Sequence, residues 1–241
     1  MNLTVDQGNT RLKVGIFSGT ELQKVFLDPS LDELRDLLKE NNIEAAIISS
    51  VRQETAGLKD LLRPVSKVFE LTPSLDVPVK NLYHSPQTLG MDRLAAVVGA
   101  NELYPQEHCL VIDTGTSITY DLIDDQGNYQ GGGISPGLHL RFKALNDHTS
   151  KLPLIEIKEA DVALIGKDTQ SSIRSGVLHG TTAEIEGIIR RYEQKFSNLK
   201  VLLCGGDAAF FESMLKASIF AVPHLVLIGL NSILMHHAKG N

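Results

Sequence analysis

Apolar and polar residues alternate along the first part of the chain. Residues 2–6 (NLTVD) and 11–17 (RLKVGIF) have the period of two that is typical of strands, and the residues QGN between them favour a turn. In the second run Leu12, Val14 and Ile16 fall on one face. The run LQKVFL at residues 22–27 predicts a third strand.

A helical period follows at residues 30–42 (SLDELRDLLKENN), where Ser30 and Glu33 form a capping box. Four leucines form the apolar stripe of this predicted helix, at positions 31, 34, 37 and 38. The next predicted elements are a buried strand at 45–50, a helix over 54–65 ending near Pro64, and a short strand at 67–71. Residues 71–86 are rich in proline and predict a loop.

The second half of the chain repeats this order. Strands are predicted at residues 109–113 (CLVID) and 117–124 (SITYDLID), and DDQGNY at 124–129 predicts a hairpin turn. After it, YQGGGISPG leads into irregular or helical chain. The remaining predictions are a long helix from about Thr169 to Phe196, a strand and glycine turn at 200–206, and a helix at 207–217.

The most apolar stretch lies near the C-terminus, at residues 217–237. Pro223, His224, Asn231 and Ser232 interrupt it, so it holds no uninterrupted apolar span of the length a bilayer requires. We expect a buried strand, a turn at Pro223 and an amphipathic helix.

Composition excludes some partners and compartments. The 241 residues carry a net charge of −6 and no clustered basic footprint, which argues against nucleic acid. Cys109 and Cys204 lie far apart inside apolar runs, which predicts two buried thiols in a reducing cytoplasm. The N-terminus has no signal-peptide pattern, and no histidine spacing indicates a metal site. We therefore expect a cytoplasmic protein without nucleic-acid or membrane partners.

Two predicted turns share the same pattern of aspartate, glycine and threonine. DQGNT begins at Asp6 and DTGTS at Asp113; each has an aspartate after an apolar strand, a glycine two residues on, and a threonine close behind. Such a glycine lets backbone N–H groups approach an anion, and the aspartate can hold hydrated Mg²⁺ against phosphate oxygens. One copy also fits an ordinary turn, but two copies at matching positions favour a nucleotide held from both sides. The chain has no Walker P-loop.

The segment GMDRLAAVVGAN at residues 90–101 is the third feature. Gly90 ends a loop and a helical pattern follows, so Asp92 lies in or near the first turn of a helix. An acidic residue is ordinary there because it complements the helix dipole. The alternative is a carboxylate at the reacting centre, with Arg93 beside it to clamp a carboxylate or phosphate.

Several glycine-rich segments stay open to two interpretations. The run at 131–133 is a flexible bend or a wall that a substrate approaches closely, and CGGD at 204–207 is a plain turn or passes under an adenine. Thr169 lies near the N-terminus of the long predicted helix, where capping explains it. Gly176 and Gly180 are costly inside a helix, which indicates close helix packing or a subunit contact.

In this order the motifs resemble the type III pantothenate kinases of the acetate/sugar kinase–Hsp70–actin superfamily. The likeness runs over nearly the whole chain and rests on DQGNTRLK, LGMDR, DTGTSITYD, GGGISPG, IGKDTQSSIRSGVLHG and CGGD. It implies an α/β fold of two duplicated actin-like (ribonuclease H-like) halves, residues 1–105 and 106–241. Mixed β-sheets flanked by helices would form each half, with a nucleotide cleft between them.

The resemblance also implies an activity. Members of this family phosphorylate pantothenate to 4′-phosphopantothenate with ATP, the first step of coenzyme A biosynthesis. They use Mg²⁺ and a monovalent cation, K⁺ or NH₄⁺. They are homodimers with substrate and cation sites at the subunit interface, which would give Gly176 and Gly180 a purpose.

The resemblance carries roles over to matching positions. Asp92 is the implied general base, Asp113 the ligand of the monovalent cation, and Asp6 the group that holds Mg²⁺ through water. The implied ATP contacts are Asp6, Gln7, Gly8, Asn9, Thr10, Arg11, Leu12, Lys13 and Thr116. The implied pantothenate contacts are Tyr83, Gly90, Met91, Asp92, Arg93 and Thr169.

Three positions depart from the family pattern. Met91 stands in place of alanine, Asp168 in place of asparagine, and Cys204 in place of threonine. The first two put detail of the substrate loop in question. Two alternatives are a non-catalytic regulatory relative and another small-molecule kinase of the superfamily, but Asp6, Asp92 and Asp113 are all present. The short chain and the Tyr83…GMDR element also disfavour a sugar kinase.

Overall fold

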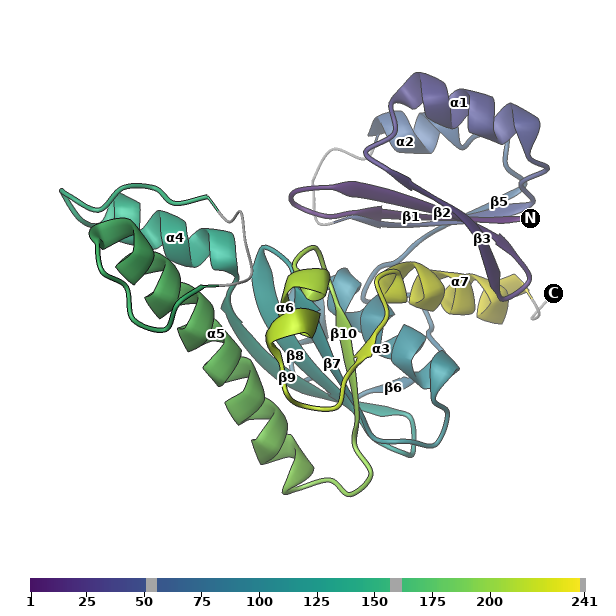
Figure 1. Cartoon of the computed structure of the whole chain (residues 1–241). Coiled ribbons are helices and arrows are strands. Elements are labelled where there is room, and N and C mark those ends of the chain that lie inside the picture. The colour runs from purple at the N-terminus through teal and green to yellow at the C-terminus, as the bar shows by residue number, and fades with distance from the viewer. Residues whose placement is uncertain (51–55, 157–161, 239–241) are drawn as a thin grey trace. The chain divides into compact units, whose positions relative to one another are not determined.

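The computed structural model describes residues 1–50, 56–156 and 162–238 (Figure 1). By their contacts the residues form two compact units. The first comprises Met1–Gln106, Ile123–Gly131 and His224–Asn241. The second comprises Glu107–Leu122 and Gly132–Pro223. The predicted halves, 1–105 and 106–241, describe a repeat rather than contact units, and they stay a prediction.

The first sheet lies in the first unit, and in the part of the chain that the structure describes it has five strands in the order β3-β2-β1-β4-β5. β1, β2 and β3 are antiparallel neighbours, whereas β4 and β5 run parallel to β1. The predicted strands are all confirmed: β1 Asn2–Gln7, β2 Leu12–Ser18, β3 Glu21–Leu27, β4 Ala45–Ser50 and β5 Lys67–Glu70.

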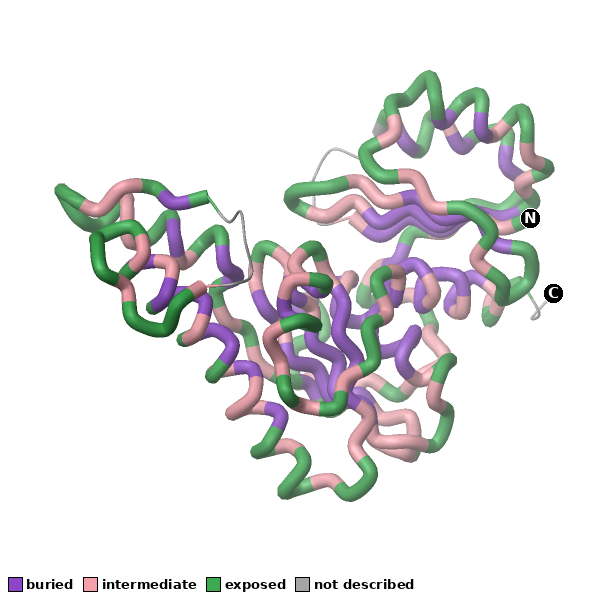
Figure 2. The backbone as a smooth tube through the Cα atoms, in the orientation of Figure 1, coloured by how far each residue is buried: buried purple, intermediate pink, exposed green. Residues whose placement is uncertain are grey.

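Two helices cover one face of this sheet, α1 (Leu31–Glu40) and α2 (Ala56–Leu61) (Figure 1). The capping box of α1 is confirmed: the Glu33 N–H donates to Ser30 Oγ at 3.2 Å and the Ser30 N–H donates to Glu33 Oε2 at 2.7 Å. Figure 2 shows the outer side of α1 exposed and the strands beneath it buried. The first two residues of the predicted second helix lie outside the described residues. The core of this face comprises Leu3, Val5, Val14, Ile16, Leu34, Leu37, Ala46, Ile48, Leu58, Leu62 and Val65.

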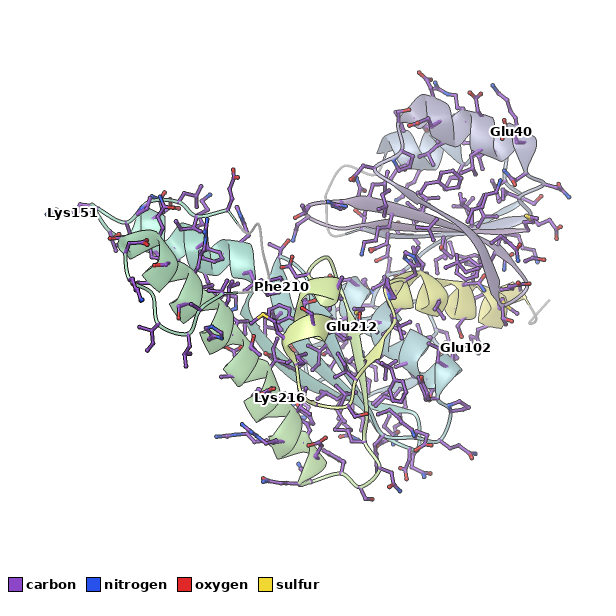
Figure 3. The ribbon with its side chains drawn as sticks, viewed as in Figure 1. Glu40, Glu102, Lys151, Phe210, Glu212 and Lys216 are labelled. Atoms are coloured by element: carbon purple, nitrogen blue, oxygen red, sulfur yellow. The ribbon has the colours of Figure 1, made fainter. Side chains whose placement is uncertain are left out.

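The other face of the first sheet packs on α7 (Leu225–Ala238), which also packs on α3 (Met91–Leu103). α7 was expected to be amphipathic, and this is wrong. It is buried on most of its sides, because the sheet covers one side and α3 another. Ser232 of α7 donates to the Glu102 carboxylate of α3 at 2.8 Å, and Figure 3 labels Glu102. Among the described residues, no helix is long and apolar enough to cross a bilayer.

Within the described residues, the second sheet has six strands in the order β11-β10-β7-β8-β9-β6. Its strands are β6 Lys80–Asn81, β7 Cys109–Thr114, β8 Ser117–Ile123, β9 Asn128–Pro136, β10 Lys200–Cys204 and β11 Phe220–Ala221. β6 is a short strand inside the predicted loop and pairs with Asn128 and Tyr129. The prediction of a buried strand before Pro223 is wrong, because β11 has two residues and both are exposed.

The helices of the second unit are α4 (Leu138–Asp147), α5 (Thr169–Glu193) and α6 (Ala208–Met214). α5 ends before the predicted Phe196, and the predicted α6 is confirmed. A short 3₁₀ helix, η1 (Pro86–Thr88), precedes α3 in the first unit. The core of the second unit includes Leu110, Ile112, Ile118, Leu138, Phe142, Ile173, Leu178, Ile185, Ile189, Val201, Leu203 and Phe211. Both cysteines are buried, as predicted, and they form no disulfide with each other.

Candidate active site

The turn between β1 and β2 contains the first glycine motif. The Gly8 N–H donates to the Arg11 carbonyl at 3.0 Å, which closes the turn. Asn9, Thr10 and Arg11 are exposed there, and Gln7 and Leu12 are half-buried. The turn therefore presents its polar groups to solvent at the end of the sheet.

Asp6 lies just before this turn and is 8% exposed. It pairs in register with Lys13 of β2 and with Ser49 of β4. Paired residues on neighbouring strands point to the same face of a sheet, so these three side chains form one row across β2, β1 and β4. We call them the Asp6 row.

Asp92 lies in the first turn of α3, as predicted, with Gly90 as the N-cap. Asp92 Oδ1 accepts the Arg93 N–H at 2.8 Å. A Cβ on residue 90 would lie 2.5 Å from Asp92 Oδ1, much closer than real Cβ atoms approach other atoms. With a larger residue at position 90 the Asp92 carboxylate would therefore have to move.

The guanidinium of Arg93 lies over an aromatic ring. Arg93 is 7% exposed, and its guanidinium carbon lies 5.6 Å from the centre of the Tyr83 ring. Tyr83 stacks in turn on the buried Tyr129, with 6.1 Å between ring centres and 8° between ring planes. The predicted substrate residues Tyr83 and Arg93 are therefore neighbours, joined by a cation–π contact. Gly131, at φ +95°, lies against the same ring, and a Cβ there would be 3.2 Å from Tyr83 Cδ2.

Asp113 belongs to the second unit, at the end of β7, where it pairs with Cys204 of β10. Gly205 follows with φ +98°, and a Cβ on it would lie 2.5 Å from Asp113 Oδ1. The turn is tied to β7 by two further bonds: Thr114 Oγ1 donates to the Cys204 carbonyl at 2.8 Å, and the Asp207 N–H donates to the Thr114 carbonyl at 2.9 Å. The glycine leaves room for the carboxylate above the turn.

Thr116 and Thr169 are exposed. The Thr116 carbonyl accepts the Gly137 N–H at 3.1 Å, so the second glycine turn packs on the start of α4. At α5 the cap is Asp168, whose carboxylate accepts the Ser171 N–H at 2.9 Å. Helix capping therefore explains the presence of Asp168 at the start of α5, but it does not explain Thr169.

The three glycines at 131–133 lie inside β9, so the flexible-bend interpretation is wrong. The backbone of Tyr120 on β8 lies against Gly132 so closely that a side chain would collide with its carbonyl oxygen. Close strand packing explains the glycine.

A cluster of hydrogen-bonded polar side chains lies beside the C-terminal part of β9. Glu184 of α5 accepts hydrogen bonds from Tyr120 at 3.0 Å and from Arg141 of α4 at 2.7 Å, and Arg141 also donates to Ser135 Oγ at 2.8 Å. Burial alone would raise the pKa of Glu184, but hydrogen bonds from Ser135, Arg141 and Tyr120 together hold it below its ordinary value. The cluster ties β8, β9, α4 and α5 together.

The two predicted cation sites differ in chemistry. No group of three or more His, Cys, Asp or Glu side chains forms a metal cage in the described residues. Mg²⁺ commonly takes one carboxylate together with waters and phosphate oxygens, and the Asp6 carboxylate beside the buried Ser49 hydroxyl fits that mode. Asp113 offers a hard oxygen ligand above a turn that only glycine leaves open, which fits a monovalent cation.

An open pocket of about 720 Å³ lies elsewhere in the first unit. It is lined by residues 77–80, Asn101, Pro105, Gln106 and 125–128. None of the predicted site residues lines it, so its size does not identify a site.

Comparison with known proteins decides the family. The family model for type III pantothenate kinases matches residues 2–191. A type III pantothenate kinase of Phocaeicola vulgatus is 46% identical over 242 residues, covering 99% of this chain and 100% of the relative. This chain belongs to the type III pantothenate kinase family. The relative from Cytophaga hutchinsonii, with the same family name, is 42% identical and covers 98% of this chain and 100% of its own.

Solved structures show the fold. A Campylobacter jejuni protein described as a candidate Baf family transcriptional activator aligns with a TM-score of 0.63 at 22% identity, covering 98% of this chain and 99% of the other. The ROK hexokinase from Thermus thermophilus aligns with a TM-score of 0.52 at 13% identity, covering 98% and 99%. The chain therefore has the duplicated α/β fold of the actin-like kinases, as the resemblance predicts. At these identities the alignments bear on the fold alone.

Sequence reasoning missed Ser49 and Tyr129. Ser49 follows the apolar residues of β4, and a polar residue at the end of such a strand was the available signal. Its place beside Asp6 depends on the register of β1 and β4, which the sequence does not reveal. Tyr129 belongs to a hairpin that was predicted, but its stacking on Tyr83 joins residues far apart in the chain.

Proposed function

We propose that this chain transfers the γ-phosphoryl group of ATP to the primary hydroxyl of pantothenate and yields 4′-phosphopantothenate, the first step of coenzyme A biosynthesis. The observation that carries the proposal is the 46% identity to a pantothenate kinase over the full length of both chains. The presence of all three motif aspartates supports a catalytic member rather than a regulatory one.

On the acceptor side we assign the general base to Asp92. Its Oδ1 is held by the Arg93 N–H, which leaves the carboxylate oriented at the start of α3. We assign pantothenate contacts to Tyr83, Gly90, Met91, Arg93 and Thr169. The buried guanidinium of Arg93, fixed by Tyr83, suits a bidentate grip on the pantothenate carboxylate.

On the donor side we assign ATP contacts to residues 6–13 and to Thr116. Phosphoryl transfer asks mainly for alignment and charge stabilisation, and exposed backbone N–H groups of glycine turns suit both. Mg²⁺, when bound, neutralises charge on the phosphates, and Asp6 would hold it through water. We assign K⁺ or NH₄⁺, a monovalent counter-charge, to Asp113.

We propose a homodimer in which α5 meets its counterpart near Gly176 and Gly180. A Cβ on either glycine would meet nothing within 4 Å among the described residues, so packing inside the chain does not explain them. A subunit contact would. We also place the reaction in the cytoplasm, which suits two cysteines that form no disulfide with each other.

The test of the catalytic assignment is Asp92→Asn. A general base supplies about 10²–10⁴-fold, so kcat is expected to fall at least about 10²-fold with the fold retained. Phosphopantothenate is measured by mass spectrometry, and ADP release gives the rate. The matched control is Asp147→Asn, an exposed carboxylate of α4, which is expected to keep the wild-type rate. Near wild-type turnover in Asp92→Asn would remove Asp92 from the role.

A further inference from the structure

The hydroxyl of Ser49 is buried without a partner. Ser49 is 1% exposed, and its Oγ has no hydrogen-bond partner among the described residues. A buried hydroxyl that makes no hydrogen bond carries a free-energy penalty, so such a group calls for an explanation.

The neighbouring serine shows the contrast. Ser50 Oγ donates to Gln7 Oε1 at 2.9 Å in the next register pair of the same two strands. Thr4, which lies on the Asp6 face of β1 two residues before Asp6, donates to the Gly15 carbonyl at 3.4 Å. The hydroxyls of Ser50 and Thr4 therefore have hydrogen-bond partners, whereas that of Ser49 has none among the described residues.

The position of Ser49 gives the explanation. It lies directly beside Asp6 in the Asp6 row, with Lys13 on the opposite side of Asp6. Neighbouring strands are about 4.8 Å apart, so a serine hydroxyl that turns about its Cα–Cβ bond reaches the adjacent carboxylate. A hydroxyl offers one donor to such a carboxylate.

We propose that Ser49 is a positioning residue for the nucleotide, and that its hydroxyl donates to the Asp6 carboxylate and orients it toward the Mg²⁺-bound phosphates. Carboxylates that serve a metal are held in orientation by neighbouring hydrogen bonds, and loss of such a partner typically lowers metal affinity by about 10–100-fold. The inference rests on the proposed ATP site but not on the identity of the acceptor.

The test measures binding rather than turnover. Isothermal titration calorimetry gives the Kd of MgATP, of ATP with EDTA, and of pantothenate for the wild type and Ser49→Ala. We expect Ser49→Ala to weaken MgATP binding about 10-fold, at the lower end of that range, while ATP with EDTA and pantothenate bind as in the wild type. Because the Ser49 hydroxyl makes no hydrogen bond with the described residues, Ser49→Ala is expected to unfold at about the wild-type temperature when no nucleotide is added.

A double-mutant cycle separates positioning from packing. In an Asp6→Asn background, Ser49→Ala is expected to change the Kd of MgATP by less than about 2-fold, because the residue acts through the carboxylate. Ser49→Thr keeps the hydroxyl donor and is expected to retain most of the wild-type affinity for MgATP. Thr4→Val is the control for a buried hydroxyl on the same face, and it is expected to leave the MgATP affinity unchanged.

Three results would overturn the proposal: wild-type MgATP affinity in Ser49→Ala, an equal loss in the Asp6→Asn background, or a parallel loss of pantothenate binding. A wild type that binds no MgATP would overturn it too. A chain that binds MgATP through Ser49 but phosphorylates no pantothenate would instead refute the proposed function alone, so the two failures are distinguishable.

Discussion

Replacing Gly99 with alanine tests how closely α3 and α7 pack. A Cβ on Gly99 would lie 2.5 Å from the Leu225 carbonyl oxygen and 3.1 Å from the Gly229 nitrogen. The contact is reciprocal, since a Cβ on Gly229 would collide with the Ala95 carbonyl. Both obstacles are helix backbone, so neither can rotate away.

The magnitude follows from two opposing effects. Alanine gains about 1 kcal/mol over glycine inside a helix. Against this, an ordinary contact of 3.4 Å needs the helices to separate by at least about 0.9 Å, and a gap of 0.5–1 Å forfeits about a quarter to a half of each dispersion contact across it. Overpacking of this kind costs about 1–3 kcal/mol. Because both obstacles are helix backbone, we expect the upper part of that range, about 2–3 kcal/mol, and hence a net loss of about 1–2 kcal/mol.

Urea unfolding at a fixed protein concentration measures this loss. The control is Gly187→Ala in α5, where a Cβ would meet nothing within 4 Å in the described residues. It is expected to stabilise the chain by about 0.5–1 kcal/mol. Because α3 begins at Met91 and carries Asp92, Gly99→Ala is also expected to lower kcat. A Gly99→Ala variant as stable as the wild type would refute the packing argument.

Two more predictions concern titratable groups. Glu184→Gln leaves Arg141 without its charged partner and is expected to cost about 1–2 kcal/mol at pH 7. Because the folded-state pKa of Glu184 lies below its ordinary value of 4.5, the stability it contributes is present above that pH and lost below it. The gap between wild type and variant in urea unfolding should therefore shrink as the pH falls below 4.5, and a constant gap would contradict the assignment. Burial raises the pKa of Cys109 from 9.0 to about 12, so a thiol reagent at pH 9 should label it only after unfolding. Rapid labelling of the folded chain would contradict its burial.

Local patterns were sufficient to predict most elements. Apolar and polar residues alternate in β1 and β2, and the capping box fixes the start of α1. α7 was misjudged because its environment is not local: α3 and the sheet come from distant parts of the chain and bury it on most sides. The glycines of β9 were misread as a possible bend, because only the packing of Tyr120 against Gly132 reveals why a strand needs a glycine there.

The residues of the candidate site also fall into two groups, those that the sequence predicts and those that only the structure reveals. Asp6, Asp92 and Asp113 could be predicted because each belongs to a short sequence motif whose residue types indicate its chemistry. Neighbours supplied by distant segments could not be found, since only strand register places Ser49 beside Asp6 and only folding stacks Tyr129 on Tyr83. Sequence thus identifies the charged groups of a site more readily than the groups that hold them.

The most direct test of the proposed activity is an ADP-release assay with a panel of acceptors. Pantothenate, simple sugars and acetate are each offered with MgATP, once in K⁺ and once in Na⁺. We predict turnover with pantothenate alone, faster in K⁺ than in Na⁺, with phosphopantothenate as the product. Turnover confined to a sugar or to acetate would contradict it.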